Sequence, residues 1–507
     1  MQQTDWNTVF PLLTVVTTAG FVLILAMIGR VGQMRHSIGP AAAFISIFGL
    51  AVSACMTGWQ WYSFPQGYYP GTFNGLLQVD RFAIFFNLLL AGGAILSIML
   101  STRLTDGFKS FTGEYYALLV LATFGMMVMV STTDLVVLLV GLETMSLAVY
   151  VLVGIRREDQ RGSEAALKYF LIGAFASGFL IYGIALTYGV TESTRMERLA
   201  EMLTGASSLA GSSKMALVAL GLVLVGMFFK VSAVPFHMWV PDAYEGAPLP
   251  ITAYMAVAVK AAAFAALTRL LVVGFQPLAQ HWLPILWALS VVTMSLGNLA
   301  AIFQSSIKRM LAYSSIAHAG YLLVALASLS PEPGIAAQQR VLLSLLYYLV
   351  VYSLMNVGAF GVLVYLEHSG RPMDTLEQVR GTGYRYPLLG AAMAVFMFSL
   401  AGIPPTGGFM AKFYIFTAAI DRGLIWLVVI GVLNSAVSVY YYLRVTVQMY
   451  MRESEKTLPQ ISFSAPLAFA LAVCVLGIFY LGITPADLLD AASRAVEQTA
   501  GLITAMR

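Results

Sequence analysis

Three lysines lie deep inside apolar stretches of this sequence. Lys230, Lys260 and Lys412 each occupy a hydrophobic run, and Glu143 lies in another with no basic residue within a helical turn. A charged side chain at the centre of a lipid bilayer costs at least roughly 2.5 to 3.5 kcal/mol on insertion scales. Amines and carboxylates at that depth are typical of proton and ion pathways, so we expect these side chains to move charge. A purely structural buried pair is the alternative.

Glu143 and Lys230 are expected to form a coupled pair, because the carboxylate needs a cation from another helix. At a separation of about 6 Å and an effective dielectric near 20, their attraction would be roughly 2.8 kcal/mol. Burial disfavours the charged form of a lysine, and a nearby carboxylate favours it. Movement of the carboxylate would therefore load or release a proton. The energy is comparable to the roughly 2.3 kcal/mol that moves one charge against 100 mV.

Two histidines extend the candidate path. His318 could relay protons between Lys260 and Lys412, because imidazole titrates near physiological pH. A hydrogen bond to a neighbouring carbonyl or serine would give it a structural role instead. His237 follows Pro235, and both a relay role and a capping role at a helix break are open. Hydroxyl side chains near His318 in the sequence are Tyr313, Ser314, Ser315 and Tyr321.

Prolines interrupt two of the apolar stretches that carry lysines. Pro235 follows Lys230, and a segment with two prolines and two glycines, residues 404–408, precedes Lys412. Proline removes one helical hydrogen bond and clashes with the preceding turn, so we expect a helix break at each place. Broken backbone at membrane depth survives only inside the protein or along a water-filled cavity. Both lysines are therefore predicted to point inward.

Long apolar segments dominate the chain. Of its 507 residues 59% are hydrophobic and 10% are charged, against roughly 25% charged in soluble proteins. About 30 Å of hydrocarbon needs roughly 20 helical residues, so we predict an all-α polytopic membrane protein with about fourteen transmembrane helices. The predicted spans are residues 8–29, 41–60, 79–101, 115–131, 133–154, 167–188, 215–240, 249–275, 282–303, 308–328, 341–366, 387–420, 424–446 and 462–484.

Two five-helix sets, helices 4–8 and helices 9–13, are predicted to form inverted repeats. Helix 7 and helix 12, the fourth member of each set, carry the prolines and are expected to be discontinuous. Because five is odd, the second set must be inserted upside down relative to the first, as in many transporters. The predicted domains are residues 1–110 with helices 1–3, 111–278 with the first repeat, 279–455 with the second, and 456–507 with helix 14 and the tail.

The distribution of basic residues predicts the orientation. With the N-terminus outside, sixteen lysines and arginines face the cytoplasm and nine face the opposite side. Cytoplasmic loops carry the excess of basic residues, so both termini are expected on the outer, periplasmic side. The first apolar run has no basic residues before it and no small-residue cleavage pattern, which indicates an uncleaved anchor.

Redox cofactors and metals are not expected in this chain. Cys55 and Cys474 lie in unrelated apolar stretches without a C-x-x-C motif, and the five histidines are scattered, which argues against cluster or paired haem ligation. No nucleotide-binding glycine fingerprint or phosphate loop is present. The net charge of +4 is spread thinly, so a nucleic-acid partner is not expected.

Several segments resemble a known family. Residues 229–248 closely resemble the antiporter-like membrane subunits of respiratory complex I and their Mrp antiporter relatives, and the most specific motif is Tyr-Glu-Gly-Ala-Pro at residues 244–248. Residues 164–170, 251–264 and 407–413 resemble subunit N in particular, and the resemblance covers the chain from helix 1 to helix 14. Lys412 points to the subunit N branch, since subunit M is expected to have a glutamate there. Leu249 departs from the threonine or serine of many relatives.

The resemblance implies one proton channel in the membrane arm of a bacterial NADH:quinone oxidoreductase. Glu143 and Lys230 would be the coupling pair, Lys260 and His318 the central relay, and Lys412 the exit side. This chain would do no covalent chemistry. Flavin mononucleotide, iron-sulfur clusters and quinone would belong to other subunits. Its partners would be sister antiporter-like subunits and other membrane-arm subunits, in the lipid bilayer of the inner membrane.

Other functions stay open at this point. A subunit of a multi-chain Mrp-type cation/proton antiporter or of a membrane-bound hydrogenase would share the lysines, and sodium-dependent transport without NADH would indicate the antiporter. A stand-alone solute transporter would purify as a monomer that takes up its substrate. A quinone-binding or haem-binding redox subunit is the third alternative, which a visible haem spectrum would favour.

Overall fold

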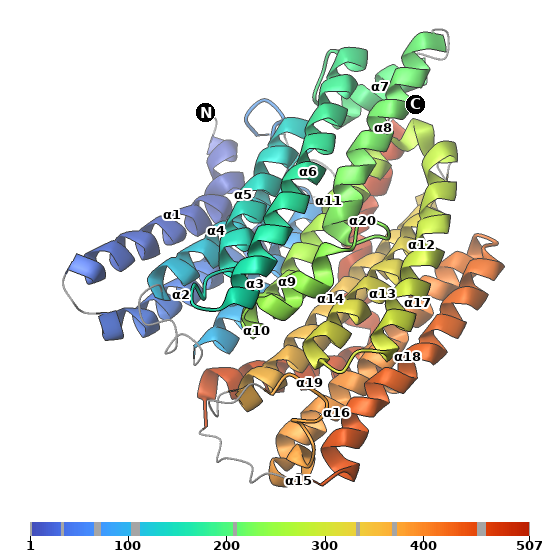
Figure 1. Cartoon of the computed structure of the whole chain (residues 1–507). Helices are drawn as coiled ribbons and strands as arrows, with labels where there is room; N and C mark the ends of the chain where they lie inside the picture. The colour runs from blue at the N-terminus through green and yellow to red at the C-terminus, as the bar shows by residue number, and fades with distance from the viewer. Residues whose placement is uncertain are drawn as a thin grey trace.

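Long tilted helices make up the computed structural model, which describes residues 3–31, 35–64, 72–102, 112–205, 210–330, 335–367, 373–453 and 463–505. Over these residues the chain forms helices and isolated β-bridges, with no β-strand. Figure 1 shows α1 to α6 on one side of the bundle and α12, α17 and α18 on the other, with α11, α14 and α20 between them. The predicted all-α class is confirmed.

Thirteen helices of the described residues are long and apolar enough to cross a membrane. One of these spans is composite, because π-helical turns η3 and η4 interrupt it. The helices are α1 Gln3–Val31, α2 Arg35–Ser63, α3 Arg81–Ser101, α4 Thr112–Val130, α5 Leu135–Val153, α6 Gln160–Thr191, α8 Ala210–Val231, the composite span Leu249–Gly274 (α10 Leu249–Tyr254, η3 Met255–Val259, α11 Lys260–Arg269, η4 Leu270–Gly274), α12 Ala279–Ile302, α13 Ile307–Ala327, α14 Ile335–Glu367, α18 Ile425–Met451 and α19 Ala465–Ile483.

The remaining predicted span, residues 387–420, is two helices. These are α16, Pro387–Ala401, and α17, Gly407–Asp421, and each is too short to span a membrane alone. Pro404 and Pro405 lie in the gap between them. The predicted break is therefore present, and the thirteen apolar spans together with this pair of helices correspond to the fourteen predicted spans.

The predicted span 215–240 is also broken. Helix α8 ends one residue after Lys230, and α9, Trp239–Gly246, begins after a non-helical turn that contains Pro235. Prolines thus end both helices where the sequence predicted. The inverted five-helix repeats and the domain limits drawn from them stay predictions.

Both breaks begin with the same hydrogen-bonded cap. Ser232 and Gly402 adopt left-handed backbone, with φ of +66° and +88°. The next N–H bonds to the carbonyl five residues back: Ala233 N to Phe228 O at 2.9 Å, and Ile403 N to Phe398 O at 3.0 Å. This is the Schellman arrangement, which satisfies carbonyls that a helix end otherwise leaves free. The chain can therefore break at both places without leaving every terminal carbonyl bare.

In the described part of the chain, three further helices appear that the sequence analysis did not predict. They are α7 Met196–Gly205, α15 Thr382–Arg385 and α20 Ala486–Ala505. The region of α20 was predicted as a tail, but this helix packs against α3 and α14. Helices α7 and α20 carry charged residues beside apolar ones, so they lack the continuous apolar run by which the membrane spans were found.

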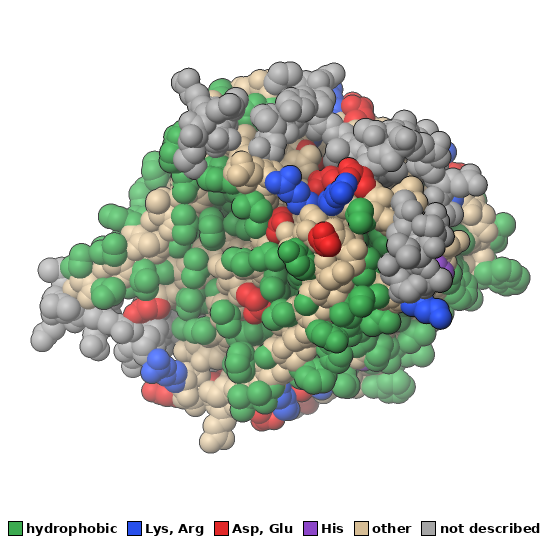
Figure 2. Space-filling view, turned by 90° about the horizontal axis from the view of Figure 1, so that it is seen from above, with side chains coloured by type: hydrophobic (Ala, Val, Ile, Leu, Met, Phe, Trp, Pro, Cys, Tyr) green, Lys and Arg blue, Asp and Glu red, His purple; other side chains and the backbone are tan. Residues whose placement is uncertain are grey.

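The bundle has a buried centre and an apolar outside. The composite span Leu249–Gly274 is completely buried, and α13 and α14 are nearly so. Outer helices expose large apolar side chains such as Phe44, Phe175 and Leu433, as expected for helices that face lipid. Figure 2 shows apolar side chains over much of one end of the molecule, with a small group of acidic and basic side chains gathered on it. Side chains on the central helices are thus kept from lipid.

Two glycines let α12 and α13 approach closely. A Cβ added at Gly297 would lie 2.6 Å from Ala317 N, and one added at Gly320 would lie 2.6 Å from Met294 N. Small residues at such crossings are the usual means of close helix packing in membranes. Because His318 lies between Ala317 and Gly320, this contact fixes the part of α13 that carries the predicted relay histidine.

Candidate functional site

Lys230 is held by two hydroxyl groups of α5. Its Nζ donates to Ser146 Oγ at 2.7 Å and to Tyr150 Oη at 3.3 Å. The ammonium also lies 5.2 Å from the ring centre of Phe229 and 5.5 Å from that of Tyr150. Only 3% of the residue is exposed, so the predicted inward orientation of Lys230 is confirmed.

Glu143 lies one turn of α5 before Ser146 and two turns before Tyr150. Glu143, Ser146 and Tyr150 are spaced three and four residues apart, which places them on one face of α5. The half-buried carboxylate accepts a 2.5 Å hydrogen bond from Ser177 Oγ on α6. No lysine, arginine or histidine nitrogen of the described residues lies within 4.0 Å of it. Glu143 interacts electrostatically with Lys230, but the two side chains are not in direct contact.

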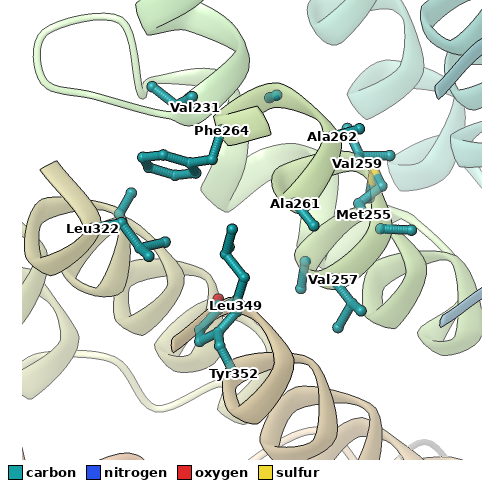
Figure 3. Close-up of a cluster of buried hydrophobic side chains, with 14 of the residues drawn as sticks. Val231, Met255, Val257, Val259, Ala261, Ala262, Phe264, Leu322, Leu349 and Tyr352 are labelled. Atoms are coloured by element: carbon teal, nitrogen blue, oxygen red, sulfur yellow. The ribbon is translucent and has the colours of Figure 1, made fainter. Parts of the chain in front are cut away.

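Lys260 lies at the buried centre of the molecule, directly after the π-helical turn η3. Its exposed fraction is 2%. Nζ donates to the backbone oxygen of Ser315 at 2.5 Å and also to the hydroxyl of Ser315, and it lies 5.6 Å from the ring centre of Tyr352. Figure 3 shows apolar side chains around this helix, with Val257 and Ala261 turned toward Leu349 and Tyr352 of α14.

His318 has a tyrosine hydroxyl at each ring nitrogen. Nδ1 lies 2.6 Å from Tyr348 Oη on α14, and Nε2 lies 3.0 Å from Tyr442 Oη on α18. Tyr442 also hydrogen-bonds to Ser314. A phenol can donate or accept, so the imidazole keeps both hydrogen bonds in either tautomer. The partners of His318 are thus groups that can pass a proton, rather than the carbonyl or serine of the structural alternative.

Lys412 is held at the helix break. Its Nζ donates to the oxygens of Leu400 and Ala401 at 3.0 and 2.9 Å, and to Ser435 Oγ on α18 at 2.9 Å. Those oxygens are the last carbonyls of α16, which have no partner within the helix and carry its partial negative charge. Lys412 is 5% exposed and lies 5.1 Å from the ring centre of Tyr321. The break therefore supplies the acceptors for the lysine.

Helix α13 connects Lys260, His318 and Lys412. Ser315, His318 and Tyr321 are spaced three residues apart, so they lie along one face of α13. Ser315 binds Lys260, and the ring of Tyr321 faces Lys412. Both lysines interact electrostatically with His318. The predicted central position of the histidine between two lysines is thus seen in the structure.

Tyr352 and Tyr244 add further hydroxyl groups to this centre. Tyr352 Oη donates to Ser315 Oγ at 2.9 Å, and Tyr244 Oη lies 3.3 Å from the same atom. The ring of Tyr352 is 5.0 Å from that of His318, centre to centre. Lys260 and His318 therefore share neighbours. Lys230 lies further along, on α8, which packs against α11.

His237 is not brought into this line. It lies half-buried in the turn between α8 and α9. Within the described part of the chain it makes no hydrogen bond to Lys230, Lys260, His318 or Lys412. Its predicted lower-ranking role in the relay has no geometric support, and a role at the helix break fits its position.

A buried ion pair was missed by the sequence analysis. Arg269 of α11 binds Asp80 through two hydrogen bonds of 2.9 and 2.7 Å, and both side chains are almost completely buried. Asp80 also accepts from Ala83 N at the start of α3. The sequence shows an aspartate before an apolar run, which indicates a cap. Its arginine is 189 positions away, so no local pattern could reveal the pair.

An open charged cavity lies beside the second part of the broken helix. Arg309 binds Asp242 at 3.0 Å and Glu245 at 2.7 Å, and Lys168 binds Glu164 at 2.7 Å. The cavity has a volume of about 270 Å³. It adjoins α9, whose Tyr244 reaches Ser315. The short helix α9 therefore contacts both the charged cavity and, through Tyr244, the buried Ser315 that binds Lys260.

Comparison with known proteins identifies the family. Residues 132–438 match the family described as NADH:quinone oxidoreductase/Mrp antiporter, TM. NADH-quinone oxidoreductase subunit N of Trichlorobacter lovleyi is 44% identical over 482 residues, which cover 94% of this chain and 96% of the relative. This chain therefore belongs to the NADH:quinone oxidoreductase/Mrp antiporter membrane family. Within the family, the similarity to subunit N predicted from residues 164–170, 251–264 and 407–413 and from Lys412 is confirmed.

Solved structures show the same fold. A chain of respiratory complex I from Thermus thermophilus with bound aureothin is 33% identical, with a TM-score of 0.75, covering 94% of this chain and 98% of that chain. A chain of the Mrp complex from Dietzia sp. DQ12-45-1b is 22% identical, with a TM-score of 0.81, over 100% of both chains. The second similarity concerns the fold alone.

Proposed function

We propose that this chain is a proton-translocating subunit in the membrane arm of an NADH:quinone oxidoreductase. Protons move along Lys230, Lys260, His318 and Lys412, and Glu143 couples this movement to quinone reduction elsewhere in the complex. One observation carries the proposal: α13 aligns the serine that binds Lys260, the relay histidine and the tyrosine that faces Lys412 on one face. A buried row of titratable nitrogens with hydroxyl partners is suited to proton transfer.

The relatives support the assignment to this complex. The protein from Trichlorobacter lovleyi is named as a subunit of NADH-quinone oxidoreductase, and the Thermus thermophilus chain is part of respiratory complex I. On this proposal, the partners are sister antiporter-like subunits and other membrane-arm subunits. Flavin mononucleotide, iron-sulfur clusters and quinone are bound by other subunits. The chain spans the bacterial inner membrane with both termini outside, as the basic residues predict.

A multi-chain cation/proton antiporter is the second candidate, because the Mrp chain from Dietzia has the same fold. The greater identity to subunit N, over nearly the whole chain, favours the oxidoreductase. Purification of the chain in mild detergent separates the two candidates. A large assembly with flavin and NADH oxidation supports the proposal, whereas a flavin-free assembly with sodium-dependent proton exchange contradicts it.

Substitution of Lys260 by arginine tests the proton path. Arginine keeps a buried positive charge but does not release its proton, so a structural role would survive and a relay would not. We expect Lys260→Arg and Lys260→Ala to lower NADH-driven proton pumping by at least roughly tenfold, as for loss of a positioned proton-transfer group. The measurement is proton uptake by liposomes that contain the purified complex, with electron transfer recorded in parallel.

The matched control is Lys214→Arg, since Lys214 is an exposed lysine at the start of α8. It is expected to pump like the unmodified complex. Normal pumping by both Lys260→Arg and Lys260→Ala, in fully assembled complex, would contradict the proposed function.

A further inference from the structure

Lys230, Lys260 and Lys412, the three lysines within the apolar stretches, each have one serine partner on another helix. The pairs are Lys230 with Ser146 at 2.7 Å, Lys412 with Ser435 at 2.9 Å, and Lys260 with Ser315 at hydrogen-bond distance. An aromatic ring also faces each ammonium group, with distances to the ring centre between 5.1 and 5.6 Å. The same combination therefore occurs three times, on three different pairs of helices.

None of these lysines is paired with a carboxylate in direct contact. Among the described residues, no aspartate or glutamate oxygen lies within 4.0 Å of the three ammonium groups. Buried charges are ordinarily paired with an opposite charge, because an isolated one is costly. Here the ammonium groups are stabilised by neutral groups: hydroxyls, backbone carbonyls and the faces of aromatic rings. Such groups stabilise the ammonium without fixing its proton as an adjacent anion would.

We propose that Ser146, Ser315 and Ser435 are positioning residues that bind their lysines in both protonation states. The inference rests on the proposed proton path. A backbone carbonyl can only accept, so it can take an N–H of the ammonium or of the neutral amine but cannot donate to the lone pair of the amine. A serine hydroxyl accepts from the ammonium and can also donate to the lone pair of the amine. The serine therefore keeps the lysine in place through a transfer cycle.

The hydroxyls of Ser146 and Ser435 each have a backbone carbonyl as acceptor for their hydrogen. Ser146 Oγ donates to Leu142 O at 2.5 Å, and Ser435 Oγ lies 3.4 Å from Ala401 O, so each oxygen is left to accept from its lysine. When an ammonium passes one proton to the next acceptor, it becomes an amine with a free lone pair. The serine hydrogen then turns from the carbonyl to that lone pair. The serine neither gains nor loses a proton.

Ser315 has a second source of hydrogen bonds. Tyr352 Oη donates to it, and Tyr244 Oη is close enough to accept from it. Its hydroxyl therefore has partners on α9, α11 and α14, and it can turn between them as Lys260 changes state. The other titratable groups near the three lysines are all retained in the serine variants, and they are Glu143, Tyr150, Tyr244, His318, Tyr321 and Tyr352.

The test is a set of serine variants in the complete complex. Ser146→Ala, Ser315→Ala and Ser435→Ala remove the hydroxyl, and NADH-driven pumping into liposomes is measured against pH. We expect pumping about tenfold slower in each variant, from loss of one hydrogen bond to a charged group. The alkaline limb of the pH profile should shift about one unit lower, because the lost bond to the charged ammonium is stronger than the lost bond to the neutral amine, so the ammonium releases its proton more easily.

Conservative variants and a matched serine separate positioning from packing. Threonine at the same positions keeps a hydroxyl and should restore both rate and pH profile. Ser344→Ala is the control, because Ser344 is as buried as Ser146 and Ser315, and its hydroxyl donates to Val341 O of its own helix. Its profile should match that of the unmodified complex.

Different results overturn different claims. If the three alanine variants pump at the normal rate with an unshifted profile, while Lys260→Ala does not pump, the serine inference fails and the proton path stands. A slower rate with an unshifted profile, or no recovery with threonine, also overturns the inference, since it indicates packing alone. Normal pumping by lysine-to-alanine variants defeats the proposed function itself.

Discussion

The two tyrosine hydroxyls that contact His318 are compatible with either tautomer of its imidazole ring. Tyr348 and Tyr442 come from two different helices and bind opposite sides of one imidazole. A histidine held by a carbonyl would be fixed in one tautomer, because a carbonyl only accepts. Two phenols allow the ring to receive a proton on one side and release it on the other. This arrangement is what a relay between Lys260 and Lys412 requires.

Removal of either hydroxyl should slow the relay without loss of packing. Phenylalanine keeps the ring, so Tyr348→Phe and Tyr442→Phe are each expected to lower proton pumping by roughly 2- to 10-fold, the usual value of one hydrogen bond. Tyr347→Phe is the control, because Tyr347 is a neighbouring buried tyrosine that donates to Leu481 O instead. Pumping is measured in liposomes with assembled complex. Equal rates in all three variants would count against His318 as a relay.

The charged members of the line were predictable from sequence, whereas most of their partners were not. Lys230, Lys260 and Lys412 stand out because a charge in an apolar run is costly and rare. Ser315 and Tyr321 were found because they share a helix with His318. The hydroxyls that come from other helices are ordinary residues in their own segments, and only three-dimensional packing brings them to the lysines.

Two helix breaks interrupt the membrane-spanning helices inside the protein. Each break begins with a left-handed residue, Ser232 or Gly402, and contains a proline before the next helix starts. At the second break, the last carbonyls of α16 turn to Lys412. The interruption thus exposes backbone acceptors inside the protein, where a continuous helix would have none.

Gly402→Ala should disturb the second break and Lys412 together. A side chain at φ of +88° costs roughly 1 to 2 kcal/mol, and the added Cβ would lie 3.0 Å from Lys412 Cδ. We expect lower thermal stability and slower pumping. Gly423→Ala is the matched control, since its φ is +73° but no atom lies within 4 Å of the added Cβ. It should lose similar stability and keep its pumping rate; equal pumping by both variants would contradict a role of the break.

The breaks could be predicted, but the short amphipathic helices could not. Proline in the middle of an apolar stretch has a direct steric effect on a helix, and the sequence alone shows it. Helix α20 has charged residues spaced three to four positions apart, with apolar residues between them. It packs against α3 and α14, and the sequence of α20 alone does not show this contact. Hydropathy therefore finds continuous apolar spans, whether they face lipid or protein, and misses amphipathic helices whose apolar face is covered by neighbours.

At the level of the whole molecule, Arg269 and Asp80 join the centre of the bundle to α3. Two hydrogen bonds at 2.7 and 2.9 Å connect the buried side chains. Loss of one partner leaves an uncompensated buried charge, which typically costs about 3 to 5 kcal/mol. This pair therefore holds the end of α11 against the start of α3.

Arg269→Ala is expected to lower the stability of the assembled complex by about 3 to 5 kcal/mol. The measurement is thermal inactivation in mild detergent, with the amount of complex in membranes as a second readout. The double variant Arg269→Gln with Asp80→Asn removes both charges and should recover much of the loss. A double variant as unstable as Arg269→Ala would show that the charge pair is not the cause.

Sequence alone could give the number of spans and their limits, but not their arrangement. Span length follows from bilayer thickness, and each predicted span has its counterpart among the helices. Which helices are neighbours depends on side-chain packing between segments far apart in the chain. The contact of Lys260 with Ser315, 55 positions away, is an example. No single-segment property determines such a contact.

The complete enclosure of residues 249–274 has a physical consequence for the membrane around it. A helix that touches no acyl chains has no hydrophobic mismatch to relieve, because its surroundings are protein on every side. A change in bilayer thickness affects the outer helices α1, α6 and α18, which can adjust by tilting or by changing the local thickness of the bilayer. The depth of Lys260 is set by its neighbours in the bundle and is shielded from lipid composition.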